Sequence, residues 1–197
     1  MSEAEGIVSE VEDTAASANG DHVDRVLAQW ARVRPELDLT PMAVIARLGR
    51  AAAYLDAGIN AGLSGFGLSR ASWDVLASLR RSGPPYRKSP TELYLALMRT
   101  SGAMTHRLAR LERSGLIRRV PDPGDGRGLL VELTVKGVQL VDRAAPAHLN
   151  NERALLASLS ADDQAELARL LRTLLRSFER SHPGPPAEQR KRRTAHP

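Results

Sequence analysis

The chain has 197 residues and a formal net charge of +5, with 42 % apolar and only 4 % aromatic residues, a Leu- and Ala-rich composition typical of helical domains. It has no cysteine, which excludes a disulfide framework, a thiolate metal site and a thiol redox sensor. The start of the sequence lacks a basic and apolar leader, and no apolar run approaches 18 residues. We therefore expect a cytoplasmic protein with no membrane partner.

The first 62 residues read as an acidic segment followed by two helices. Residues 1–20 carry five acidic residues and no basic residue, and we expect them to be disordered. From Asp21 to Val33, apolar residues including Trp30 recur at helical spacing. Thr40-Pro41 supplies a cap and a first-turn proline for the next helix, which runs to about residue 62. Residues 21–62 are thus predicted to form N-terminal helices.

Residues 63–137 have the pattern of a winged helix-turn-helix domain. Ser69 is placed to cap a helix that ends at Gly83-Pro84-Pro85, and Ser89-Pro90-Thr91-Glu92 is a capping box for a second helix. A third helix, 101–114, carries Met104, Leu108 and Leu111 on one face and ends at Gly115. Two strands, 116–120 and 129–133, are then expected around the Gly-rich turn 122–127.

The polar face of helix 101–114 suits contact with DNA, because small residues allow close approach and arginines reach phosphates or guanine edges. From Arg80 to Arg127 the sequence has eleven Lys or Arg and four Asp or Glu, a local net charge of +7. A solvated basic face is the common alternative, but these charges coincide with the helix pair and the wing. We predict that the following residues contact double-stranded DNA: Ser101, Ala103, Thr105, His106, Arg110, Arg113 and Arg127.

Residues 138–182 are predicted to be C-terminal dimerisation helices. A helix that starts at Thr134 should kink or restart at Pro146 and continue over 148–159. Ser160-Ala-Asp-Asp163 then caps a last helix whose Leu and Phe residues, from Leu167 to Phe178, need an apolar partner. This stripe indicates a homodimer. The Pro-rich tail, 183–197, is expected to be flexible, and its basic run either adds salt-sensitive DNA affinity or is inert.

No pattern of catalytic or metal-binding residues stands out. The five histidines lie far apart in sequence, so none of them has the spacing of a metal site. The sequence has no Gly-x-Ser-x-Gly turn and no Gly-x-x-x-x-Gly-Lys loop. We expect no catalytic residue, no metal and no cofactor.

The combination PTEL, T-x-R-x-x-RLE-x-x-GLIRR, D-x-x-DGR and LT-x-x-G resembles the MarR family of bacterial transcriptional regulators, over residues 21–179. The resemblance implies a mainly α fold with a small β-wing and an interlocked helical homodimer. It also implies that the N-terminal helices, residues 21–62, serve a ligand pocket and dimerisation. Such a dimer places two recognition helices on a palindromic operator, about one turn of DNA apart, most often as a repressor. A ligand-independent architectural DNA-binding protein is the alternative class.

Within that family, the chain is similar to the urate-responsive branch. In that branch, a Trp on an extra N-terminal helix, an Asp after Trp, an Arg of the recognition helix and an Arg of the next strand form or gate the purine pocket. The similarity places these four on Trp30, Asp74, Arg107 and Arg119. A guanidinium beside an indole suits a flat anionic ligand such as urate.

Helical geometry adds that Arg107 lies about 70° from the centre of the apolar stripe, so it should point along the protein body. Urate or a related purine is the expected effector, and a phenolic acid or an antibiotic is the alternative. The purely structural alternative makes Trp30 a core residue and Asp74–Arg119 a fixed ion pair.

Overall fold

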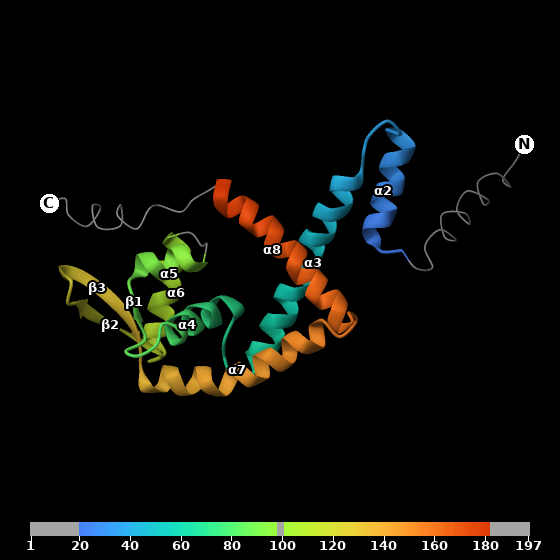
Figure 1. Cartoon of the computed structure of the whole chain (residues 1–197). Helices are drawn as coiled ribbons and strands as arrows, with labels where there is room; N and C mark the ends of the chain where they lie inside the picture. Colours follow the sequence, from blue (N-terminus) through green and yellow to red (C-terminus); the bar gives the residue numbers. More distant parts are fainter. Residues whose placement is uncertain (1–19, 98–100, 182–197) are drawn as a thin grey trace, which may run out of the picture. The chain divides into compact units, whose positions relative to one another are not determined.

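The computed structural model describes residues 20–97 and 101–181 of the chain. They form helices and one three-stranded antiparallel sheet (Figure 1), which confirms the predicted class, mainly α with a small β-wing. The chain divides into two compact units, residues 1–56 and 57–197. The predictions of a disordered acidic segment and a flexible basic tail concern residues outside the described ranges, apart from Gly20.

The first unit contains α2 (His22–Val33) and most of α3 (Thr40–Ser64). Asp21 caps α2, and its side chain accepts hydrogen bonds from two backbone N–H groups of the first turn, at 2.7 and 3.0 Å. The side chain of Asp24 accepts in return from the Asp21 N–H at 2.8 Å, which completes a capping box. Nε of Arg47, on α3, lies 2.8 Å from Oδ2 of Asp21, so the cap also joins the two helices.

α3 differs slightly from its prediction. Thr40 is already helical, and the residue that bonds its N–H is Asp38, at 2.9 Å, so the cap lies before Thr40 rather than on it. The helix also continues to Ser64, two residues beyond its expected end. Within one chain only Ile59 and Leu63 of this helix are buried. The apolar residues of its first half are therefore available to another surface.

The second unit begins with the end of α3 and continues with the helices of the helix-turn-helix. These are α4 (Arg70–Arg81), α5 (Pro90–Leu97) and α6 (Ser101–Arg113). The predicted caps are confirmed: Oγ of Ser69 accepts from the Ser72 N–H at 3.2 Å at the start of α4. At the start of α5, Ser89 and Glu92 exchange side-chain and backbone hydrogen bonds of 2.8 and 3.1 Å.

α6 ends at the predicted glycine. Gly115 has φ +69°, a left-handed conformation that costs little only in glycine. Beyond it, the Leu116 N–H bonds to the carbonyl of Leu111 at 3.1 Å, a bond that closes the last turn and redirects the chain into the sheet.

The sheet contains β1 (Arg87–Lys88), β2 (Ile117–Asp122) and β3 (Asp125–Leu133), in the order β1-β3-β2. The two predicted strands are present, but they extend further into the wing, and Asp122 pairs with Asp125. The expected six-residue turn is therefore shorter, because the Asp122 side chain accepts from the Gly124 N–H at 2.9 Å and tightens it. β1 was not predicted, since two basic residues carry no alternating apolar pattern.

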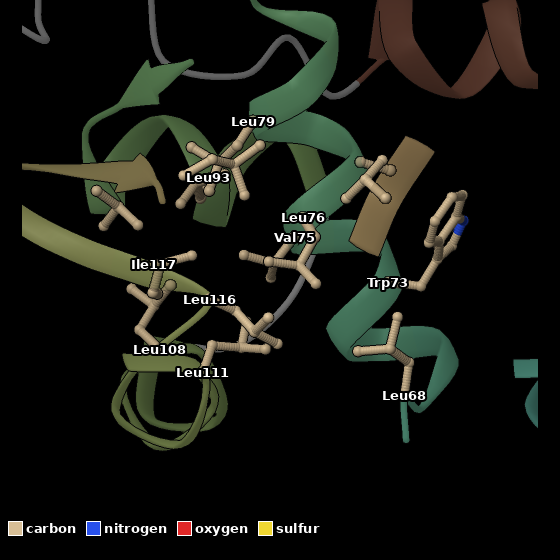
Figure 2. Packing of buried hydrophobic residues seen from close by; sticks show 14 of the residues in the cluster. Leu68, Trp73, Val75, Leu76, Leu79, Leu93, Leu108, Leu111, Leu116 and Ile117 are labelled. Carbon is tan, nitrogen blue, oxygen red and sulfur yellow. The ribbon is translucent and has the colours of Figure 1, made fainter. Parts of the chain in front are cut away.

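The core of the second unit lies where the helix-turn-helix meets the sheet (Figure 2). Its members are mostly Leu and Val side chains with little or no exposure, and α4, α5 and α6 all contribute to it. The residues labelled in the figure are Leu68, Trp73, Val75, Leu76, Leu79, Leu93, Leu108, Leu111, Leu116 and Ile117. This packing fixes α6 against the sheet through its apolar face, so the opposite face is turned outward.

The last two helices are α7 (Val135–Leu155) and α8 (Ala161–Ser181). Thr134 caps α7 as predicted, accepting from the Gly137 N–H at 3.1 Å. Of the two outcomes predicted at Pro146, a kink or a restart, the restart is wrong, because the chain stays helical through this residue. Proline removes one backbone hydrogen bond and strains the preceding turn, but packing can outweigh that cost.

α8 has no buried residue within the chain. The exposed side chains of its apolar stripe are Leu167, Leu170, Leu175 and Phe178. Its cap is nevertheless well formed: the Asp163 N–H bonds to Oγ of Ser160 at 3.1 Å, and Oγ of Ser160 bonds to the Asp163 carboxylate at 2.6 Å. The helix is thus well capped, but none of its residues is buried by the described part of the chain.

Candidate nucleic-acid interface

α6 presents two faces of different chemistry. Met104, Leu108 and Leu111 are 2–3 % exposed, which confirms the predicted core face. On the other side, the five predicted DNA-contacting residues whose side chains are described are all exposed: Ala103, Thr105, His106, Arg110 and Arg113. An exposed helix face of small, polar and cationic residues fits the width and the negative potential of a major groove.

For the other two predicted DNA-contacting residues, the structure describes only the backbone. The backbone of Ser101 begins α6, and that of Arg127 lies in β3 beside the wing turn. Their side chains are outside the described part of the structure. Their contact with DNA stays a prediction.

Two of the predicted ligand residues, Arg107 and Arg119, lie on α6 and on the strand that follows it. Arg107 is half-buried and its Nη1 atom is buried, so this side chain lies partly against the protein body, as its helical angle predicts. Nε of Arg119, on β2, lies 3.3 Å from Oε2 of Glu112 near the end of α6. Arg119 therefore joins α6, the predicted recognition helix, to β2 of the wing.

The expected pairing of Asp74 with Arg119 is not what this structure shows. Asp74 is half-buried on α4, and among the described residues the ion pair of Arg119 is made with Glu112. The neighbour of Asp74, Trp73, is 8 % exposed and packs its ring 4.8 Å from the ring of His148 on α7. Arg119 pairs with Glu112 because α6 and β2 are joined by a short turn, which holds the two side chains beside each other.

Trp30 belongs to α2 in the first unit, whereas the other three predicted ligand residues belong to the second. It is 40 % exposed, so within the chain it is not a core residue. This exposure contradicts the structural alternative for the tryptophan, which was burial in the core. A large exposed indole is available to a ligand or to another protein surface.

A buried acidic residue at the base of the wing was missed by the sequence analysis. Glu132, on the central strand β3, has a side chain only 6 % exposed and binds Arg87 of β1 and Arg118 of β2. Burial by itself raises the pKa of the Glu132 carboxyl, but the hydrogen bonds from the two arginines outweigh it and hold the pKa below its ordinary value. One carboxylate thus ties all three strands together.

One feature of the sequence could have predicted a buried carboxylate here: Glu132 is an acidic residue inside the apolar run Leu129–Leu133. A buried carboxylate needs cationic partners, but the sequence does not say which ones. Among the described residues there is no group of His, Cys, Asp and Glu side chains that suits a metal ion. In the same part of the chain, no helix is long and apolar enough to cross a membrane.

The fold and the surface of α6 together define a winged helix-turn-helix protein of the DNA-binding class. A MarR family model matches residues 66–128, which run from the start of the helix-turn-helix into the wing. The chain is also 39 % identical, over 149 residues, to the HTH-type transcriptional regulator PecS of Dickeya dadantii (strain 3937), covering 76 % of this chain and 90 % of that protein. The chain therefore belongs to the MarR family of transcriptional regulators, rather than to a class of enzymes.

Two solved structures of DNA complexes are similar to this chain. A mutant of MarR from E. coli, complexed with operator DNA, has a TM-score of 0.61 and 28 % identity, covering 74 % of this chain and 97 % of the other. Sco3205 from Streptomyces coelicolor, a MarR family regulator in complex with DNA, has a TM-score of 0.65 and 27 % identity, with 77 % and 96 % coverage. These similarities support the assignment of DNA binding to this fold.

Proposed function

We propose that the protein is a homodimeric repressor that binds a palindromic operator and is released from it by a small anionic ligand, urate or a related purine. The observation that carries the DNA-binding part is the division of α6 into a buried apolar face and an exposed polar, cationic face. The local net charge of +7 from Arg80 to Arg127 adds the attraction to phosphates that operator binding requires.

The dimer is supported by the apolar side chains that one chain leaves exposed. Leu170, Leu175 and Phe178 on α8 are each more than half exposed, as are Val44 and Ile45 on α3. Isolated surface apolar residues are common, but a stripe along a 21-residue helix is not. We assign this stripe, together with the N-terminal helices, to the subunit interface. A two-fold dimer then presents two copies of α6, which matches a palindromic site.

For DNA recognition we propose contacts from Ser101, Ala103, Thr105, His106, Arg110, Arg113 and Arg127. Arg110, which is exposed on the second half of α6, is assigned to base edges because a guanidinium can bind guanine O6 and N7 with two hydrogen bonds. Arg127, next to the wing turn, is assigned to the minor groove or its phosphates. The first contact sets sequence preference and the second mainly affinity.

For the effector we propose Trp30, Asp74, Arg107 and Arg119 as the ligand-responsive set. Two of these residues act directly on the DNA-reading elements: Arg107 is part of α6, and Arg119 binds Glu112 of the same helix. A ligand anion that competes for Arg119 weakens its bond to Glu112 and changes how α6 is held on β2. The ligand shifts the equilibrium only as far as its affinity differs between the bound and released forms.

A titration of the preformed operator complex with urate, xanthine and hypoxanthine tests the effector. We expect release of DNA with a coupling of about 1–3 kcal/mol, which corresponds to about a 5- to 150-fold change in operator affinity. Trp30→Ala and Arg107→Ala should abolish the response, while Arg143→Ala on α7 serves as a control for loss of a surface charge. If salicylate or an antibiotic releases the DNA and purines at about 1 mM do not, the effector belongs to the phenolic or antibiotic class.

A further inference from the structure

We propose that a cavity at the base of the wing is a second ligand site, which takes a small amphipathic carboxylate. The cavity, of about 570 Å³, lies between the start of α7 and the face of the sheet that carries Arg118 and Glu132. It belongs entirely to the second unit. The proposal goes beyond the purine response and does not depend on it.

The walls of this wing-base cavity are largely apolar. They are formed by Pro85, Tyr86, Leu133, Val135 and Val138. Val135, at the first position of α7, is 76 % exposed, although burying a valine side chain stabilises a protein by roughly 1.5–3 kcal/mol. The volume falls within the range of about 300–1,000 Å³ typical of small-molecule sites, enough for one or two rings.

The exposed charged group of this cavity is the guanidinium of Arg118. Glu132 also lines it, but its side chain is 6 % exposed, and its two oxygens are bound by Arg118 and Arg87. Arg118 has a side chain 62 % exposed and uses Nε and Nη2 toward Glu132, with Nε 2.7 Å from Oε1. Arg118 also lines the cavity, so its guanidinium can donate to a ligand carboxylate there, and the bonds to Glu132 fix the guanidinium in place for this contact.

One wall is held by an unusual backbone conformation. Tyr86 has φ +61°, a left-handed conformation that is uncommon outside glycine. Three contacts hold it there: its N–H bonds to the Gly83 carbonyl at 2.6 Å, its carbonyl accepts from the Leu133 N–H at 3.2 Å, and the Arg80 guanidinium lies 4.9 Å from its ring centre. Tyr86 is therefore a fixed wall, and binding requires little ordering of the site.

This site is distinct from the one proposed for purines. Arg118 and Arg119 are successive residues of β2, so their side chains lie on opposite faces of the strand. Arg119 binds Glu112 of α6, whereas Arg118 binds Glu132 of β3. Arg118 connects the two long strands of the wing. A ligand carboxylate that binds Arg118 therefore changes the contact between β2 and β3 and not the contact of α6 with β2.

Isothermal titration calorimetry of the full chain without DNA, with 2-naphthoate as the probe, tests the proposal. The neutral 2-naphthamide and the cationic 2-naphthylmethylammonium have similar shape and serve as matched ligands. We expect saturable binding of naphthoate below about 1 mM and at least about tenfold weaker binding of the other two. Equal binding of naphthoate and naphthamide, or no naphthoate binding at this concentration, would overturn the proposal.

Two variants locate the probe by independent means. Arg118→Gln removes the anion contact, and Val135→Trp fills the cavity from an exposed position that leaves the core intact. Each should weaken naphthoate binding by about tenfold or more, while Arg143→Gln and Trp30→Ala should bind like the wild type. If Trp30→Ala loses the probe and the two cavity variants retain it, the probe occupies the purine position and the wing-base site is refuted. No outcome of this test depends on operator release by purines.

Discussion

Nε of Arg118 lies 2.7 Å from Oε1 of Glu132, across the two long strands of the wing. Because Arg87 binds the same carboxylate from β1, a single acidic side chain holds the edge strands to the central one. The sheet is small, with one two-residue edge strand, and it packs on the core through Ile117, Val131 and Leu133. Its geometry beside the recognition helix therefore depends on this buried ionic contact as well as on packing.

Glu132→Gln should destabilise the protein by about 1–3 kcal/mol, the usual cost of losing hydrogen bonds to a buried charged group. The measurement is urea unfolding at neutral pH. Glu132→Asp, which keeps the charge but shortens the reach, is the matched comparison and should retain part of the stability. Wild-type stability in the glutamine variant would show that the two arginines are held without the carboxylate.

The same contact predicts a pH dependence. The pKa of Glu132 is lower in the folded protein than its ordinary value of 4.5, so the unfolded chain binds the proton more readily. The stabilisation is therefore fully present above about pH 4.5 and is lost as the pH falls through the folded-state pKa. Chemical unfolding between pH 7 and pH 3 should show a steeper loss of stability in the wild type than in Glu132→Gln. Parallel curves would contradict the assignment.

Gly137→Ala should be strongly destabilising. A Cβ at this position would collide with the backbone carbonyl oxygen of Leu116, where the first turn of α7 approaches the start of the wing. Overpacking of this kind costs about 1–3 kcal/mol, and the backbone partner cannot rotate away. Gly49→Ala is the control, because its Cβ would meet nothing within 4 Å, and alanine in a helix should stabilise by about 0.5–1 kcal/mol. Thermal unfolding of the two variants should shift in opposite directions.

Much of this fold could be predicted because its boundaries are set by nearby residues. Ser89 caps α5 through Glu92, and Thr134 caps α7 through the Gly137 N–H, each three residues away, while Gly115 ends α6 by its own conformation, so these roles can be read from sequence. Glu132 is different: its partners, Arg87 and Arg118, are 45 and 14 residues away, and only the strand register brings them together. The partner of Arg119 was mistaken for a different reason: Glu112 is close in sequence, across the short turn between α6 and β2, but only the more distant Asp74 was considered.

DNA recognition predicts different effects for two arginines. Arg110→Ala should lower the affinity for the preferred operator by about 1–3 kcal/mol and relax base preference. Arg127→Ala should instead weaken binding to most duplexes and reduce the slope of log affinity against log salt. Fluorescence anisotropy with operator and scrambled duplexes, at several salt concentrations, separates the two. Arg143→Ala should leave both quantities unchanged, and identical behaviour of all three variants would contradict the assigned interface.

The dimer should persist at low concentration if the apolar stripe of α8 is its interface. Multi-angle light scattering of the wild type at micromolar concentration should give twice the 21.4 kDa mass of one chain. Replacing the exposed Leu170 and Phe178 by glutamate should produce monomers or misfolded chains, because a carboxylate buried in an apolar interface has no partner. A folded wild-type monomer would contradict the proposed interface.

The most direct test of operator recognition is selection of bound sequences from a randomised duplex library by the wild-type protein. We predict enrichment of a palindrome whose half-sites are about 10 base pairs apart, with one dimer bound to each duplex. Arg110→Ala, carried through the same selection, should enrich the palindrome weakly or not at all. Strong binding by the wild type with no enriched motif would contradict the proposed function, because it would make the protein a nonspecific architectural DNA binder.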